Sequence, residues 1–225
     1  MCIILDGTNG LNGASKAAAS KPPKPPKAPN GIPGTWFASG TNGSPGSPGV
    51  DSNTIANNAK DGQNGTDASS AIIFVGTMTS LCILGRGGDG GNGGTAGTSG
   101  GDGGDGGNGG SASGSGGGGD GGDGGRGGQG ALGGRGGKAG KGAHVILYYH
   151  YMSSGSITTD LSAGKPGMGG TGGFGGSGGL GGKGGKAAFF LAPNGADGTN
   201  GSSPSRTTNQ GGQPNVAGTL DPRYY

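Results

Sequence analysis

The stretch GGDGGDGGRGGQGALGGRGGKAGKG, residues 118–142, carries a side chain larger than methyl at every third position, with glycine or alanine between. A polyproline II helix has three residues per turn and no internal hydrogen bonds. Wound in this way, the repeat places every large side chain on one edge and leaves two bare edges for neighbouring backbones. The unpaired N–H and C=O groups then need partners in adjacent helices. The stretch therefore predicts a bundle of polyglycine II helices joined by backbone hydrogen bonds.

The same phase extends through two glycine tracts, residues 85–143 and 164–186. Glycine-rich segments are commonly flexible linkers, but here the phase is maintained and the third residue changes type in blocks, which favours order. We expect the third residues to line the bundle edges. Acidic edges are expected near basic edges of antiparallel neighbours, and the apolar residues are expected to cover a β-layer. These edge residues are Asp102, Asp105, Asp120, Asp123, Arg126, Arg135, Lys138, Lys141, Met168, Phe174 and Leu180.

The composition excludes several classes of protein. Glycine supplies 67 of the 225 residues and apolar residues only 27%, whereas ordinary domains are about 45–50% apolar, so a conventional core is not expected. The 13 prolines do not follow the Gly-X-Y order of collagen. No apolar run approaches the ~18 residues of a membrane span, and no signal-peptide pattern is visible. The net charge of +3 comes without a dense basic stripe, which argues against nucleic acid as a partner.

Short apolar runs divide the chain. The predicted fold is irregular and all-β: a polyglycine II bundle with short strands and hairpins, and no α-helix. Residues 71–84 are expected to form two strands, a first candidate hairpin, that meet near Gly76 to Ser80. KPPKPPK at 21–27 is expected to be a stiff extended spacer. In order, we expect an N-terminal strand and Pro/Gly-rich arm (1–50), a β-strand segment (51–84), a glycine tract (85–143), a β-hairpin (144–163), a second tract (164–186), and a strand with an extended tail (187–225).

Residues that carry chemistry are sparse. Cys2 and Cys82 each lie in a short apolar run, where buried free thiols are the favoured interpretation and a bridge between them stays open. His144 and His150 are interpreted as hairpin side chains. We expect no catalytic, cofactor-binding or metal site, and therefore no enzymatic activity.

The tracts GGDGGNGG (residues 87–94) and GGTGGFGGSGGLGGKGG (residues 169–185) resemble the polyglycine II bundles of two protein families. These are the snow flea antifreeze proteins and the distal receptor-binding adhesins on the long tail fibres of T-even-like phages. The resemblance implies the bundle architecture. It adds two functions as alternatives, binding to a host receptor at a fibre tip and binding to ice.

The first functional hypothesis is a non-enzymatic structural protein that assembles with copies of itself into an extracellular or virion-borne fibre. The apolar N-terminal residues Met1, Cys2, Ile3, Ile4 and Leu5 lie at the end of the proline-rich arm, where an isolated strand would fray. Such a strand is suited to pairing with an exposed sheet edge. Pairing with the next subunit would propagate a filament, and pairing within the subunit would make the arm a brace.

Overall fold

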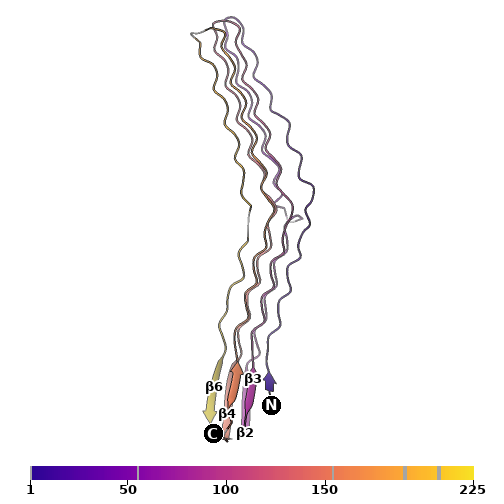
Figure 1. Cartoon of the computed structure of the whole chain (residues 1–225), viewed down its shortest axis with the longest axis vertical. Coiled ribbons are helices and arrows are strands. Elements are labelled where there is room, and N and C mark those ends of the chain that lie inside the picture. The colour runs from indigo at the N-terminus through magenta and orange to yellow at the C-terminus, as the bar shows by residue number, and fades with distance from the viewer. Residues whose placement is uncertain (1, 55, 154, 190–191, 207–208) are drawn as a thin grey trace.

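The computed structural model describes residues 2–54, 56–153, 155–189, 192–206 and 209–225. In these ranges the chain has six short strands and no α-helix, and long extended segments connect the strands. Figure 1 shows the strands gathered at one end of a slender rod, together with both termini. The strands are β1 (Cys2–Ile4), β2 (Ala71–Met78), β3 (Leu81–Leu84), β4 (His144–Met152), β5 (Ile157–Asp160) and β6 (Thr219–Tyr224).

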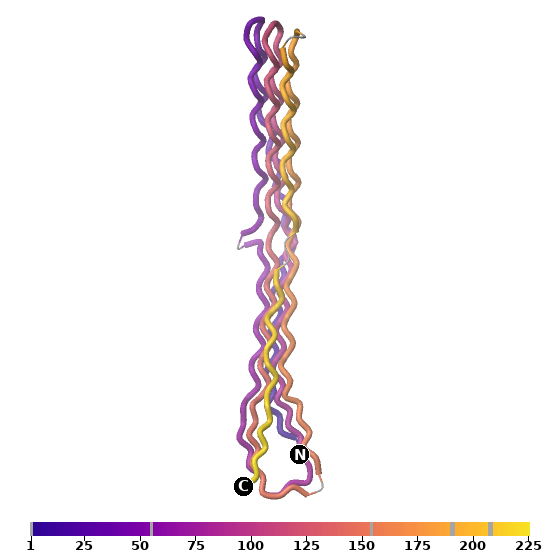
Figure 2. The backbone as a smooth tube through the Cα atoms, turned by 90° about the vertical axis from the view of Figure 1, so that its left-hand side faces the viewer, coloured from indigo at the N-terminus to yellow at the C-terminus, as the bar shows by residue number. Residues whose placement is uncertain are grey.

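Each strand continues into one extended segment that runs the length of the rod. The three segments that leave the strand end are A (2–35), C (81–112) and E (157–187). The three that return to it are B (39–54 and 56–78, with a turn at 56–57), D (117–152) and F (193–206 and 209–224). At about 3.1 Å per residue, segment C spans roughly 100 Å. Figure 2 shows the chain reversing at both ends of this rod, and Figure 1 shows that the rod bends near its middle.

Segments A, C and E form one layer in which neighbours run parallel. Gly7 of segment A donates its N–H to the carbonyl of Arg86 in segment C at 2.8 Å, and Gly10 donates to Asp89 at 2.7 Å. Segment C pairs with segment E, and segments B, D and F with one another, at the same spacing. A bond at every third residue confirms the predicted threefold helices.

The two layers are joined by a second set of backbone bonds. Gly88 N donates to Thr66 O at 2.9 Å, and Gly91 N donates to Gln63 O at 2.8 Å. The partner numbers run in opposite directions, so neighbours in different layers are antiparallel. Segments C and D are the middle segments of their layers, with a parallel neighbour on each side and antiparallel partners in the other layer, so they form the inside of the bundle.

Glycine is required here for its missing side chain. Among the described residues no glycine has a positive φ, so the special backbone freedom of glycine is not used. A Cβ built on Gly137 would overlap the carbonyl group of Gln63 in the next segment. The two bare edges of each helix are therefore where backbones meet, as the repeat predicts.

At the strand end the bundle changes into two three-stranded parallel sheets, ordered β1-β3-β5 and β2-β4-β6. Their facing surfaces supply a small apolar core in which Ile83, Val145 and Leu147 are fully buried. β-branched and aromatic residues favour strands, and they are concentrated in β2 and β4. The sheets thus close one end of a rod that otherwise has almost no apolar interior.

Both predicted hairpins are wrong. Although β2 and β3 are consecutive, they lie in different sheets, as do β4 and β5 within the predicted hairpin at 144–163. Each reversal carries the chain into the other layer, so each strand pairs with one from a distant hairpin. Ile72, for example, pairs with Ile146.

The arm and the tail also differ from expectation. Residues 5–35 form segment A of the bundle, and the proline tract lies within it. Residues 187–189 and 192–193 contain no strand, since they form part of the reversal between segments E and F. The last strand is β6, within the predicted extended tail.

The N-terminal strand pairs inside its own chain. Ile3 of β1 is in register with Ile83 of β3, and Cys2 forms a disulfide with Cys82. Of the two alternatives, β1 therefore follows the one in which the N-terminal arm braces its own subunit, and it does not pair with the next subunit. The expectation of free thiols is wrong. Met1 lies outside the described residues.

Candidate functional surface

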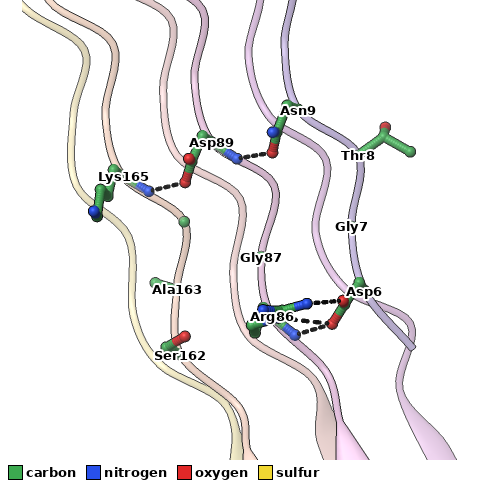
Figure 3. A pocket seen from close by; sticks show the side chains of 11 residues that line it. Asp6, Gly7, Thr8, Asn9, Arg86, Gly87, Asp89, Ser162, Ala163 and Lys165 are labelled. Atoms are coloured by element: carbon green, nitrogen blue, oxygen red, sulfur yellow. Dashed lines mark hydrogen bonds and ion pairs between the residues drawn. The ribbon is translucent and has the colours of Figure 1, made fainter. Parts of the chain in front are cut away.

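The outer faces of both layers carry ladders of Asp and Asn side chains. Figure 3 shows one rung, in which Asn9 Oδ1 accepts the N–H of Asp89 at 2.8 Å and Asp89 Oδ1 accepts the N–H of Lys165 at 2.7 Å. The N–H of each third residue points outward and has no backbone partner in these rungs. The preceding parallel segment supplies an acceptor for it, so the polar edge residues complete the hydrogen bonding of the lattice.

The ladder explains the choice of acid. All 12 acidic residues of the chain are aspartate, and none is glutamate. A carboxylate or amide one methylene from the backbone reaches the adjacent segment without folding back. In the second layer the acceptors Asp51, Asp61, Asn64 and Asp67 bind the N–H groups of Gln129, Arg135, Lys138 and Lys141, and Asp120 and Asp123 bind those of Ala196 and Thr199.

The predicted acidic and basic edges do meet, but across parallel neighbours and with a different partner. Asp102 and Asp105 bind Lys21 and Lys24 of the proline tract, with Nζ–Oδ1 distances of 2.6 and 2.7 Å. The KPP triplets of segment A and the GGD triplets of segment C share one repeat, so successive lysines meet successive aspartates. Arg126 lies 3.5 Å from Asp51 of segment B.

We expect stability to fall at acid pH because of these aspartates. Hydrogen bonds from Lys21 and Lys24, and next from the backbone of segment E, lower the pKa of Asp102 and Asp105. A carboxyl with a lowered folded-state pKa stabilises the fold above its unfolded pKa of about 3.9. That stabilisation is lost as pH falls through the lower folded value. Melting temperature should therefore be flat near neutrality and decline below about pH 4.

The matched test uses the double variant Lys21→Met/Lys24→Met. Because the ion pairs are exposed and screened, its melting temperature at neutral pH should fall only slightly, while the decline below about pH 4 becomes shallower. An unchanged acid slope would show that the lysines do not stabilise these carboxylates.

Segment E is the last helix of its layer. Its third residues therefore have no further parallel segment whose N–H groups they could bind. They include no Asp or Asn, and the apolar ones are exposed: Met168 by 70%, Phe174 by 61% and Leu180 by 62%. The prediction that they cover the β-layer is wrong. The change of residue type between blocks reflects the position of each segment in the layer.

The open edge of segment E is closed by side chains of segment F. Asp197 Oδ1 accepts the N–H of Gly184 at 2.8 Å, and Asn200 Oδ1 accepts that of Gly181 at 3.0 Å. These N–H groups lie where a further parallel helix would bind. Such caps protect an edge against pairing with another chain, as charged residues do on edge strands.

Figure 3 shows a polar groove near the strands, lined by residues of segments A, C and E. Its acids are engaged: Asp6 binds the Arg86 guanidinium at 2.7 Å, and Asp89 holds Lys165 N. No cluster of three or more His, Cys, Asp or Glu residues able to hold a metal occurs in the part of the chain that is described. His144 and His150 lie on β4, where they bond to Thr219 and to the carbonyl of Tyr225.

The side of the rod formed by segments A and B differs from the other faces. Beyond the bend, two antiparallel rows of small or apolar side chains point outward, and all are exposed. We call these rows the uncharged flank. They consist of Pro23, Pro26, Pro29 and Ile32 from segment A, and Thr41, Ser44, Ser47 and Val50 from segment B.

The rows of the uncharged flank are tied together and regularly spaced. Ser44 N donates to Pro29 O, and Thr41 N donates to Ile32 O, both at 3.0 Å. Within a row the spacing is one helical turn, about 9.3 Å at 3.1 Å per residue. Two rows joined in this way make a narrow surface with a regular repeat.

The first row of the uncharged flank also has no free backbone N–H. Three positions of the first row are proline, which has no N–H. The N–H of Ile32 is bound by the hydroxyl of Thr41 at 2.7 Å. The surface therefore combines regular small side chains, three of them hydroxyls, with no charged group.

The sequence hypotheses overlooked this flank because they followed the third residues of the glycine tracts. In segments A and B only one residue in three is buried in the lattice, and two rows of side chains face outward. The signal was present in the triplets KPP and SPG, which place two side chains per turn outside the lattice instead of one.

Comparisons with known proteins identify no family. No protein-family profile and no curated protein matches the chain. Among solved structures, an antifreeze protein from the springtail Granisotoma rainieri, described as a nine polyproline type II helical bundle, is 24% identical, with 88% of this chain and 93% of that chain covered. The TM-score is 0.11, and we draw nothing from this likeness on fold or function.

No helix long and apolar enough to cross a membrane is found among the described residues. The Cys2–Cys82 disulfide is typical of an oxidising compartment such as the extracellular space.

Proposed function

We propose that the protein is a non-enzymatic ice-binding protein that contacts ice through the uncharged flank. The observation that carries this proposal is the contrast between faces: the outer faces of both layers carry the charged ladders, and the uncharged flank carries eight small or apolar residues in two regularly spaced rows.

The physical reason is the hydration of each surface. Lysine ammonium groups are strongly hydrated, and carboxylates likewise hold water in geometries set by the charge. Apolar surface restricts the orientation of its first water layer without binding it tightly. A flat apolar surface with a regular repeat can therefore order water into a layer that merges with a crystal face.

The rigid lattice supports the same role. A surface that matches a crystal must keep its spacing, and here each row is fixed to its neighbours by a backbone bond at every turn. The fold thus supplies a preorganised surface, which lowers the entropic cost of binding.

The test replaces Ser44 by arginine, with Ser177→Arg as the matched control. Both serines are exposed and lie on outer edges, Ser44 in the flank and Ser177 on segment E. We expect wild-type protein to enter growing ice and to produce thermal hysteresis. Ser44→Arg should reduce the hysteresis several-fold because a long, hydrated cation interrupts the flat rows, and Ser177→Arg should leave it unchanged.

Two results would overturn the proposal. One is exclusion of the wild-type protein from ice, and the other is equal loss in the two variants. Circular dichroism of both variants confirms that the fold is intact.

A receptor-binding adhesin is the second candidate, favoured by the reversals at the far tip of the rod. Trp36, Phe37 and Phe189 are exposed there, and the rings of Trp36 and Phe189 lie edge to face at 6.0 Å. Exposed aromatic residues are common anchors in binding interfaces. For the fibre hypothesis, the in-chain pairing of β1 leaves strand exchange without support, and assembly through another surface stays a prediction.

A further inference from the structure

The sheet β2-β4-β6 has an uncovered apolar face. Its inner face packs on the other sheet, and the alternate residues of β2 and β4 point away from the core. On that outer face Ile72 is 61% exposed and Phe74 is 69% exposed. Ile146 and Tyr148 of β4 lie beside them in register. We call this surface the outer sheet face, formed by Ile72, Phe74, Ile146, Tyr148 and Tyr225.

The aromatic residues of the outer sheet face are already ordered. The rings of Phe74 and Tyr148 stack at 4.8 Å with an interplanar angle of 7°, and Tyr225 packs edge-on against both. A prepacked cluster loses little side-chain entropy when a partner covers it. Parallel sheets occur almost only with both faces covered, so a bare apolar face on this sheet calls for an occupant.

We propose that the outer sheet face is the interface of a homodimer in which two copies pack face to face. This inference is independent of ice binding. A fully exposed aromatic side chain presents about 150–250 Å², so the five residues together offer on the order of 500 Å² per copy. Two copies then bury about 1,000 Å², the lower limit of a specific interface.

The charges on this face favour a second copy over a charged partner. Asp221 and Arg223 of β6 neutralise each other at 2.7 Å, and the Arg223 guanidinium lies 5.8 Å from the Tyr148 ring centroid. The face therefore has no excess of either sign, and two copies related by a twofold axis would not repel. Isologous contacts of this kind are the commonest route to a dimer.

The other sheet provides a matched control. Ile4 of β1 is 68% exposed, but its neighbours on the outside of that sheet include Thr158 and Asp160 of β5. That face is less apolar, and the same substitution there should have no effect on association. The uncharged flank lies beyond the bend of the rod, away from both sheets, so a dimer leaves it free.

The experiment is sedimentation analysis of the full chain over concentrations up to about 100 µM, which detects dissociation constants of that order. We expect wild-type protein and Ile4→Lys to form dimers, and Phe74→Lys and Ile72→Lys to raise the dissociation constant at least tenfold. Both Phe74 and Ile72 point outward, so the variants should keep the wild-type circular dichroism spectrum. A monomeric wild type overturns the proposal, as does a larger assembly that persists in Phe74→Lys or equal dissociation of Ile4→Lys.

Discussion

Replacement of Gly137 by valine is expected to destroy the cooperative fold of the rod, whereas the same change at the adjacent Lys138 is expected to leave it nearly intact. Gly137 lies in segment D, and a Cβ at this position would overlap the Gln63 carbonyl of segment B. Its N–H binds Gly91 O at 2.8 Å, and its carbonyl accepts the N–H of Gly167 at 2.9 Å. A side chain here pushes segment B away from segment D, and any shift of segment D also disturbs its bonds to segments C and E.

The expected loss of stability is large because the atoms that the valine side chain would meet belong to the hydrogen-bonded backbone. Each broken backbone bond costs about 0.5–1.5 kcal/mol net, and more where a polar group is left buried and unpaired. Because neighbouring turns share the displaced backbones, we expect a total of several kcal/mol, of the order of the whole stability of a typical domain. Lys138 is exposed. Its backbone N–H donates to Asn64 Oδ1 and its carbonyl accepts the N–H of Gly65, so a change of side chain leaves both bonds in place.

Thermal melting followed by circular dichroism compares the two variants. Gly137→Val should be unfolded or melt far below wild type, while Lys138→Val should melt within a few degrees of it. Similar melting temperatures for the two variants would contradict the role of the bare glycine edge.

The sequence was sufficient to predict the helix type and the edge that carries side chains. A repeat of exactly three residues fits the polyproline II helix, which has three residues per turn. In that helix the glycines form the two edges without side chains, where neighbouring backbones can approach. The topology could not be predicted in this way. A strand such as β2 is followed after two residues by β3, a spacing typical of hairpins, yet β2 pairs with β4. Nothing local marks a partner that lies about 75 residues away.

The candidate surface was harder to predict than the fold. The uncharged flank depends on which two segments are outermost on one side, and this is a property of the layer order. The ladders show the same dependence, since Asp89 has an acceptor role in segment C while Lys165 at the equivalent place in segment E has none. The type of the third residue therefore depends on whether its segment has a further neighbour in the layer. This relation can be used only once the order of the segments is known.

The second large effect is expected on reduction of the Cys2–Cys82 disulfide. The bridge joins residues 80 positions apart and fixes β1 against β3. A loop of this size should contribute roughly 4 kcal/mol by restricting the unfolded chain. In a domain of this length each kcal/mol corresponds to about 2–4 °C, so reduction should lower the melting temperature by roughly 10 °C.

The structural reason for this dependence is that segment A lies at the side of its layer. Its neighbour in that layer is segment C, and β1 has only three residues with which to hold the chain end in place. Without the covalent link the first residues should fray, and the loss should spread along the ladder that begins at Asp6. Hydrogen exchange of the Leu5 amide, which binds Leu84 O at 2.7 Å, should accelerate before that of segment D.

The measurement compares melting with and without a reductant, with free thiols titrated to confirm that the bridge is open. The double variant Cys2→Ser/Cys82→Ser is the control: it should match the reduced protein and should not respond to the reductant. If fully reduced protein melts at the wild-type temperature, the lattice alone holds segment A, and the bond has no stabilising role. If the reduced protein loses both stability and the exchange protection of Leu5, the fold depends on an oxidising compartment, in agreement with an extracellular rod.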